Sequence, residues 1–241
     1  PTEDELDALA VQADYVGLFR TEFVYMDAKA LPSEEEQLAC YQKLVRAGDG
    51  KPITLRTLDI GADKTLAYYD MPPEDNPALG CRALRLCLRD PELFRTQLRA
   101  ALRASVDGDL QIMFPMVSSL DDFLAAKAAV EQVKEELRRE GLPFRENVPL
   151  GIMIETPSAA MLADVLAAHV DFASIGTNDL SQYLMAADRM NPDVAAYCQS
   201  YHPAVFRLIG WAVSQFNQAG KPISVCGELG GDPLAGPVLV G

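Results

Sequence analysis

Short apolar segments alternate with longer amphipathic segments along the 241 residues, and this alternation restricts the fold more than any other feature. The apolar segments are rich in Ile, Val, Leu, Phe and Met without strict polar alternation, which is typical of parallel strands covered on both faces. Strands are expected at Tyr15–Phe19, Ile53–Ile60, Leu110–Val117, Leu150–Glu155, Phe172–Gly176 and Ile223–Gly227. Repeated strand–helix order gives either a doubly wound sheet or an eight-stranded barrel, so the sequence predicts an α/β fold.

Capping and breaking residues delimit the helices between these strands. The clearest helix spans residues 120–140, because its apolar side chains form one stripe and Gly141 follows it. Ser33 and Glu36 have the spacing of a capping box and predict a helix that ends at Gly48. Further helices are expected at Cys81–Leu88, Pro91–Ser105, Ser158–His169 and Ala204–Ala219.

Composition and charge exclude several classes of protein. The formal net charge of −14 disfavours nucleic acid as a partner, because phosphate backbones repel such a surface. No apolar run approaches the ~20 residues that a membrane helix needs, so no membrane insertion is expected. The five cysteines are odd in number and scattered, which is typical of a reducing compartment and predicts a cytoplasmic location.

Charged side chains and a thiol follow the apolar segments where the strands should end. Arg20, Arg56, Glu155, Asp179 and Cys226 all occupy such positions, whereas the starts of the strands are apolar. In a parallel barrel the carboxyl ends of the strands meet on one face, and active sites take single residues from several of them. Any one of these residues could instead be structural, as a surface ion pair or a small core thiol. Their joint occurrence predicts a site.

The residue types indicate the chemistry of this site. Glu155 and Asp179 could supply two oxygen ligands for Mg²⁺, which commonly completes its coordination shell with water and substrate oxygens. Arg20, Arg56 and Arg189 offer forked donors that match phosphate or carboxylate oxygens. A small, multiply anionic substrate is therefore expected.

Eight ordered motifs resemble those of one known family. The chain resembles the phosphoenolpyruvate (PEP)-binding barrel of enzyme I of the bacterial sugar phosphotransferase system over essentially its whole length. The motifs are Leu18–Met26, Leu55–Lys64, Asn76–Arg82, Ile112–Met116, Gly151–Pro157, Ser174–Tyr183, Asp188–Arg189 and Val225–Asp232. The resemblance implies one domain, residues 1–241, with a (β/α)8 TIM-barrel fold that lacks its first and last strands.

The resemblance also implies roles for matching residues. Residues expected to bind PEP are Arg20, Arg56, Lys64, Arg82, Asn178, Asp179 and Arg189. Glu155 and Asp179 are expected to bind Mg²⁺. Cys226 is expected to protonate the enolate carbon after the phosphoryl group leaves, which yields pyruvate. Ala62 departs from the family, which usually has a second glycine there.

Further expectations concern parts of such proteins that this sequence does not resemble. The phosphoryl-accepting His lies in the family on a separate N-terminal domain, which also binds a small phosphocarrier protein, so the chain alone is expected to be inactive in phosphoryl transfer. The full-length protein is expected to be a homodimer. Two alternatives stay open: the barrel of a pyruvate phosphate dikinase or PEP synthase, although dikinases usually have His where Leu229 stands, and a non-catalytic oligomerisation or metabolite-sensing module.

Overall fold

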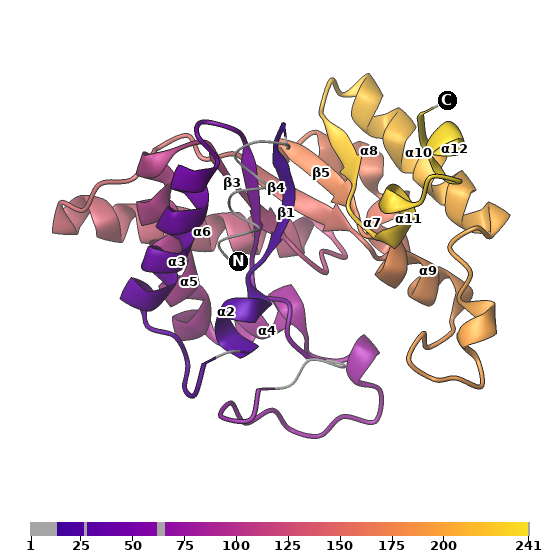
Figure 1. Cartoon of the computed structure of the whole chain (residues 1–241), viewed down its shortest axis with the longest axis horizontal. Coiled ribbons are helices and arrows are strands. Elements are labelled where there is room, and N and C mark those ends of the chain that lie inside the picture. The colour runs from indigo at the N-terminus through magenta and orange to yellow at the C-terminus, as the bar shows by residue number, and fades with distance from the viewer. Residues whose placement is uncertain (1–13, 27, 62–65, 241) are drawn as a thin grey trace. The chain divides into compact units, whose positions relative to one another are not determined.

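A computed structural model describes residues 14–26, 28–61 and 66–240 of the chain (Figure 1). The chain divides into two compact units. The first unit contains the residues up to Phe114 together with Leu124–Leu150, and the second contains Pro115–Phe123 and the residues from Gly151 onward. Within the described residues, no helix is both long enough and apolar enough to cross a membrane.

The first unit is built on three parallel strands. They are β1 (Val16–Arg20), β2 (Ile53–Arg56) and β3 (Leu110–Phe114), and each pairs with its neighbour in the sequence. The register places Arg20 beside Arg56, and Arg56 beside Met113. The two arginines therefore end adjacent strands at the same level of the sheet.

Three long helices pack side by side in this unit: α3 (Glu34–Ala47), α5 (Pro91–Ala104) and α6 (Leu120–Glu140) (Figure 1). The capping box at the start of α3 is confirmed, since Ser33 and Glu36 exchange both of its hydrogen bonds. Arg99 of α5 joins the three helices, because its Nε lies 2.6 Å from Glu34 and its Nη2 lies 2.5 Å from Glu140. Shorter helical segments are α2 (Glu22–Met26), η1 (Pro77–Leu79), α4 (Ala83–Arg89) and η2 (Ser105–Asp107).

The second unit also contains parallel strands in sequential order. Strands β4 (Leu150–Ile154), β5 (Phe172–Ile175) and β6 (Ile223–Val225) pair through registers that match Ile154 with Ile175 and Ile175 with Val225. Helix α10 packs against α7 and α8. The helical segments are α7 (Pro157–Met161), α8 (Ala163–Ala167), α9 (Thr177–Met185), η3 (Ala195–Tyr197), α10 (Pro203–Gln218), α11 (Glu228–Gly231) and α12 (Gly236–Val240).

The sequence placed the six strands correctly but extended five of them too far. Strand β3 ends at Phe114 because Pro115 has no N–H group and Met116 has a positive φ of 55°. Strand β2 ends at Arg56, and Leu58 donates its backbone N–H to the side chain of Gln97 instead of to a strand. The helix expected at residues 158–169 is two helices that meet at Leu162.

Candidate active site

The first unit presents three of the predicted anion-binding arginines. Arg20 ends β1, is exposed, and holds its guanidinium 4.8 Å from the centre of the Phe23 ring. Arg56 ends the neighbouring strand and is buried, and Arg82 is buried immediately before α4. Lys64, the fourth predicted cation of this unit, and Ala62 lie outside the described residues.

Buried carboxylates hold two of these arginines. Arg56 donates from Nη2 to Glu22 at 2.5 Å and lies 3.1 Å from Asp59 through Nη1. Arg82 donates from Nη2 to the other oxygen of Asp59 at 2.9 Å. The four side chains are at most 6% exposed, so their charges interact with little screening by water. Arg56 and Asp59 thus form a buried ion pair.

This pairing changes the expected electrostatics. Two buried guanidinium groups are matched by two buried carboxylates, so the cluster of Glu22, Arg56, Asp59 and Arg82 has no formal net charge. The cluster therefore brings guanidinium N–H groups but no net charge to this region, while Arg20 adds a charge that is open to solvent. The role of Glu22 as a partner of Arg56 was missed, although the Arg-Thr-Glu motif contained it.

The second unit presents the two predicted metal ligands at neighbouring strand ends. Glu155 directly follows β4 and is 1% exposed, and its Oε1 accepts the backbone N–H of Met116 at 2.6 Å. Asp179 lies in the first turn of α9, which follows β5, and is 7% exposed. A Cβ atom on Gly176 would lie 2.8 Å from Oε2 of Glu155, so the glycine leaves room for this carboxylate at the start of α9.

These two carboxylates fit the requirements of Mg²⁺. Both are buried, and Glu155 directly follows β4 while Asp179 lies in the first turn of the helix that follows β5, the strand paired with β4. The described residues contain no cluster of three or more His, Cys, Asp or Glu side chains that could hold a metal by themselves. A site with two carboxylates suits Mg²⁺, which commonly takes its remaining oxygens from water and a phosphorylated substrate.

The turns after β5 and β6 are joined by side-chain and backbone contacts. Asn178 donates its amide N–H to Glu228 at 3.2 Å, and Glu228 donates its backbone N–H to Oδ1 of Asn178 at 3.2 Å. Cys226 lies two residues before Glu228, and both its backbone N–H and its thiol point to the carbonyl of Ile175, at 3.1 and 3.6 Å. The thiol can donate this bond only while it is protonated, which suits a proton donor.

Arg189 lies on the loop that follows α9. It is partly buried, and its backbone N–H donates to the side chain of Gln182 at 3.0 Å. The Cys198 thiol interacts electrostatically with both Arg189 and Asp179. Burial raises the pKa of Cys198, the positive charge of Arg189 opposes that rise, and the negative charge of Asp179 adds to it. Arg189 and Asp179 therefore both lie near Cys198.

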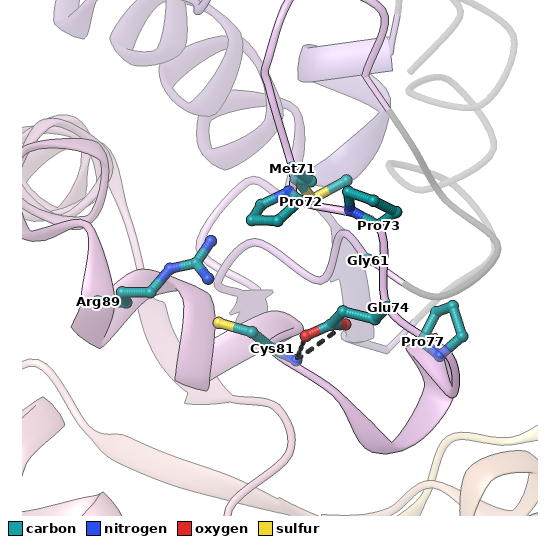
Figure 2. Close-up of a pocket in the computed structure, with 8 residues that line it drawn as sticks. All are labelled: Gly61, Met71, Pro72, Pro73, Glu74, Pro77, Cys81 and Arg89. Atoms are coloured by element: carbon teal, nitrogen blue, oxygen red, sulfur yellow. Dashed lines mark hydrogen bonds between the residues drawn. The ribbon is translucent and has the colours of Figure 1, made fainter.

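The first unit contains a pocket of about 140 Å³ (Figure 2). Cys81, which directly precedes Arg82, is one of the residues that line it. The backbone N–H of Cys81 donates to both carboxylate oxygens of Glu74, at 2.9 and 3.2 Å. The other lining residues in the described part of the chain are Gly61, Met71, Pro72, Pro73, Pro77 and Arg89. None of these lining residues is a predicted site residue, so the pocket does not identify the substrate site.

The solved structure of an HpcH/Hpal aldolase/citrate lyase family protein from Burkholderia cenocepacia J2315 resembles this chain in fold. Its TM-score is 0.55 at 16% sequence identity, and the match covers 93% of this chain and 75% of that one. At this identity the likeness concerns the fold alone. It confirms the predicted α/β class of the TIM-barrel type.

Sequence comparison gives much closer relatives. The phosphoenolpyruvate-protein phosphotransferases of Geobacillus stearothermophilus and Staphylococcus epidermidis are 51% and 50% identical to the chain, over 238 and 241 residues. The matches cover 99% and 100% of this chain but only 41% and 42% of the relatives, so the chain spans less than half of their length. Residues 2–241 also match the family described as PEP-utilising enzyme, PEP-binding domain. Because this match extends over nearly the whole sequence, the chain belongs to the PEP-binding domain family of the PEP-utilising enzymes.

Proposed function

We propose that the chain is the PEP-binding catalytic domain of an enzyme I, which carries out the Mg²⁺-dependent transfer of the phosphoryl group of PEP to a His on another domain. The product would be pyruvate, and the reaction would be the first step of sugar uptake by a cytoplasmic phosphotransferase system. The observation that carries the proposal is in the second unit, where two buried carboxylates, an amide and a thiol follow neighbouring parallel strands.

The residues proposed to donate to the phosphate and carboxylate oxygens of PEP are those that the resemblance implies, namely Arg20, Arg56, Lys64, Arg82, Asn178 and Arg189. Forked guanidinium donors suit both groups of the substrate. Because phosphoryl transfer is catalysed mainly by positioning and charge stabilisation, fixed donors are the contribution expected of these residues.

Glu155 and Asp179 would hold Mg²⁺. When bound, the ion would supply positive charge to the oxygens of the substrate. The hydrogen bond from the backbone N–H of Met116 orients the Glu155 carboxylate without the ion. Gly176 has no side chain that would occupy the space of this carboxylate at the start of α9.

Cys226 would deliver the proton that completes the reaction. After the P–O bond breaks, the electron pair stays on the oxygen of the departing enolate. The S–H bond then breaks as a new C–H bond forms at the terminal carbon, giving pyruvate and a thiolate that regains its proton from water. The carbonyl of Ile175, 3.6 Å from the sulfur, would hold the protonated thiol in place beforehand.

The partners proposed for the full-length protein follow the same family. They are a small phosphocarrier protein, bound through a separate N-terminal domain, and a second copy of the chain in a homodimer. The chain itself is proposed to bind PEP and Mg²⁺ but not to become phosphorylated on His169 or His202. A phosphohistidine at either residue after incubation with PEP and Mg²⁺ would overturn that part of the proposal.

Calorimetric titration of the chain with PEP, in the presence and absence of Mg²⁺, tests the proposed function. Binding is expected only, or at least about tenfold more tightly, with the ion. Arg20→Ala should weaken binding about tenfold without lowering the melting temperature, because Arg20 is exposed. Arg139→Ala, an exposed arginine of α6, serves as the control and should bind as the unchanged chain does. No binding of PEP with Mg²⁺ present would contradict the proposal.

The same samples distinguish a non-catalytic oligomerisation module. A protein that binds PEP and Mg²⁺ in its folded state is stabilised by about 2.7 kcal/mol at a ligand concentration of 100 Kd. A module that serves only assembly would melt at the same temperature with and without the two ligands.

A further inference from the structure

The strongest unassigned feature near the proposed site is the pairing of Glu228 with Asn178. The two residues are 50 positions apart and follow strands that lie side by side, with Ile175 of β5 in register with Val225 of β6. They share two hydrogen bonds of 3.2 Å, one from the amide of Asn178 to the carboxylate and one from the backbone of Glu228 to the amide oxygen. This pairing joins the turns that carry Asn178 and Cys226.

The chemistry of the pair fixes the orientation of the Asn178 amide. A carboxylate only accepts hydrogen bonds, so the NH₂ group of the Asn178 amide must face the Glu228 carboxylate. A backbone N–H only donates, so the amide oxygen must face the backbone N–H of Glu228. The reversed amide would place its oxygen against the carboxylate. One of the two N–H donors of Asn178 then remains beyond these two bonds, which leaves it for an anionic ligand.

Contacts at the neighbouring residues hold the same turn. A Cβ atom on Gly227 would lie 2.0 Å from Oγ1 and 2.7 Å from the backbone nitrogen of Thr177, so only glycine permits this approach. Cys226 bonds to the carbonyl of Ile175 through its backbone N–H. The consecutive residues Cys226, Gly227 and Glu228 therefore each contact the segment that leads from β5 into α9.

We propose that Glu228 is a positioning residue, which orients the amide of Asn178 toward the anionic substrate and holds the turn that bears Cys226. This inference rests on the proposed function, because it assigns Asn178 to substrate binding. Glu228 itself acts through Asn178 and through the turn. Its carboxylate is exposed, so its loss leaves the buried core unchanged.

Calorimetric titration with PEP and Mg²⁺ of the chain and its variants tests this role. Glu228→Ala should weaken the binding of PEP about tenfold, because the amide loses the acceptor that orients it. Glu228→Gln should bind within about threefold of the unchanged chain, since its side-chain oxygen can still accept from Asn178. Glu135→Ala, which removes an exposed carboxylate from α6, is the control for the change in charge and should have no effect.

A double-mutant cycle separates action through Asn178 from any independent effect. In the Asn178→Ala background, Glu228→Ala should change the affinity by less than about twofold. Three outcomes would each overturn the inference: PEP binding that Glu228→Ala leaves unaltered, PEP binding by Glu228→Gln as weak as that by Glu228→Ala, or effects of the two substitutions that multiply in the cycle. In each case, PEP binding by the unchanged chain would still support the proposed function. Failure of the unchanged chain to bind PEP with Mg²⁺ would overturn both.

Discussion

The Arg82 guanidinium donates to Asp59 at 2.9 Å, and both side chains are almost completely buried. The second oxygen of the same carboxylate lies 3.1 Å from Arg56. Asp59 thus sets the distance between two arginines that come from different parts of the sequence, one at the end of β2 and the other before α4. This buried carboxylate therefore holds both guanidinium groups in place.

Asp59→Asn is expected to destabilise the chain by about 3 kcal/mol. Removal of one partner from a buried ion pair leaves an uncompensated charge, which is costly in a medium of low polarity. Urea unfolding followed by circular dichroism measures this loss. Asp75→Asn, at an exposed position of the same unit, should change the free energy of unfolding by less than about 0.5 kcal/mol. Equal stabilities of the two variants would show that Asp59 does not hold the arginines.

The order of strands and helices was predictable because apolar periodicity and capping residues are local signals. Helix α6 spans the predicted residues 120–140, and α10 lies within one residue of the predicted Ala204–Ala219 at each end. The short helices α9 and α11 were not predicted, because four to nine residues give too little periodicity for a helix to be recognised.

The candidate site was predictable by residue type but not by pairing. The motifs named Arg56, Arg82 and Asn178, yet the partners Glu22 and Glu228 depend on contacts across 34 and 50 residues. Such contacts arise only when parallel strands bring their ends together, and a single sequence does not specify them. The close approach of Gly227 to Thr177 has the same origin.

Glu155→Gln should remove the dependence of PEP binding on Mg²⁺ while leaving the fold intact. The glutamine keeps an oxygen that can accept the N–H of Met116, so the turn after β3 retains its hydrogen bond. The lost negative charge weakens a hard cation site, and calorimetry should show PEP binding with Mg²⁺ at least about tenfold weaker. Asp164→Asn, at an exposed position of α8, is the control and should bind normally. Full Mg²⁺ dependence in Glu155→Gln would exclude Glu155 as a ligand.

Glu140→Gln should destabilise the chain at neutral pH but not in acid. The hydrogen bond from Arg99 lowers the pKa of Glu140 below its ordinary value of 4.5. A carboxyl group with a lowered pKa contributes stability that is present above its unfolded-state pKa and is lost as the pH falls through its folded-state pKa. The difference between the two proteins in urea unfolding should therefore shrink once the pH falls below 4.5.

The exposed glutamate Glu135 of the same helix provides the control for this pH dependence. Glu135→Gln should change the free energy of unfolding by less than about 0.5 kcal/mol at neutral pH, because substitutions at exposed positions usually change protein stability very little. A difference between Glu140→Gln and the unchanged chain that stayed constant from neutral pH into acid would rule out the Arg99 interaction as its cause.

Gly227→Ala should destabilise the turn that bears Cys226, whereas Gly231→Ala, at the end of the short helix α11 that follows this turn, should not. The new methyl group at residue 227 would lie 2.7 Å from the backbone nitrogen of Thr177, and because this atom belongs to the main chain, the turn itself must move. A loss of about 2 kcal/mol in the free energy of unfolding is expected, together with weaker PEP binding. A Cβ atom on Gly231 would have no heavy atom within 4 Å, so that variant should be neutral or slightly stabilised. If the two alanine variants unfold at the same urea concentration and bind PEP alike, the close approach of Gly227 to Thr177 does not fix the turn.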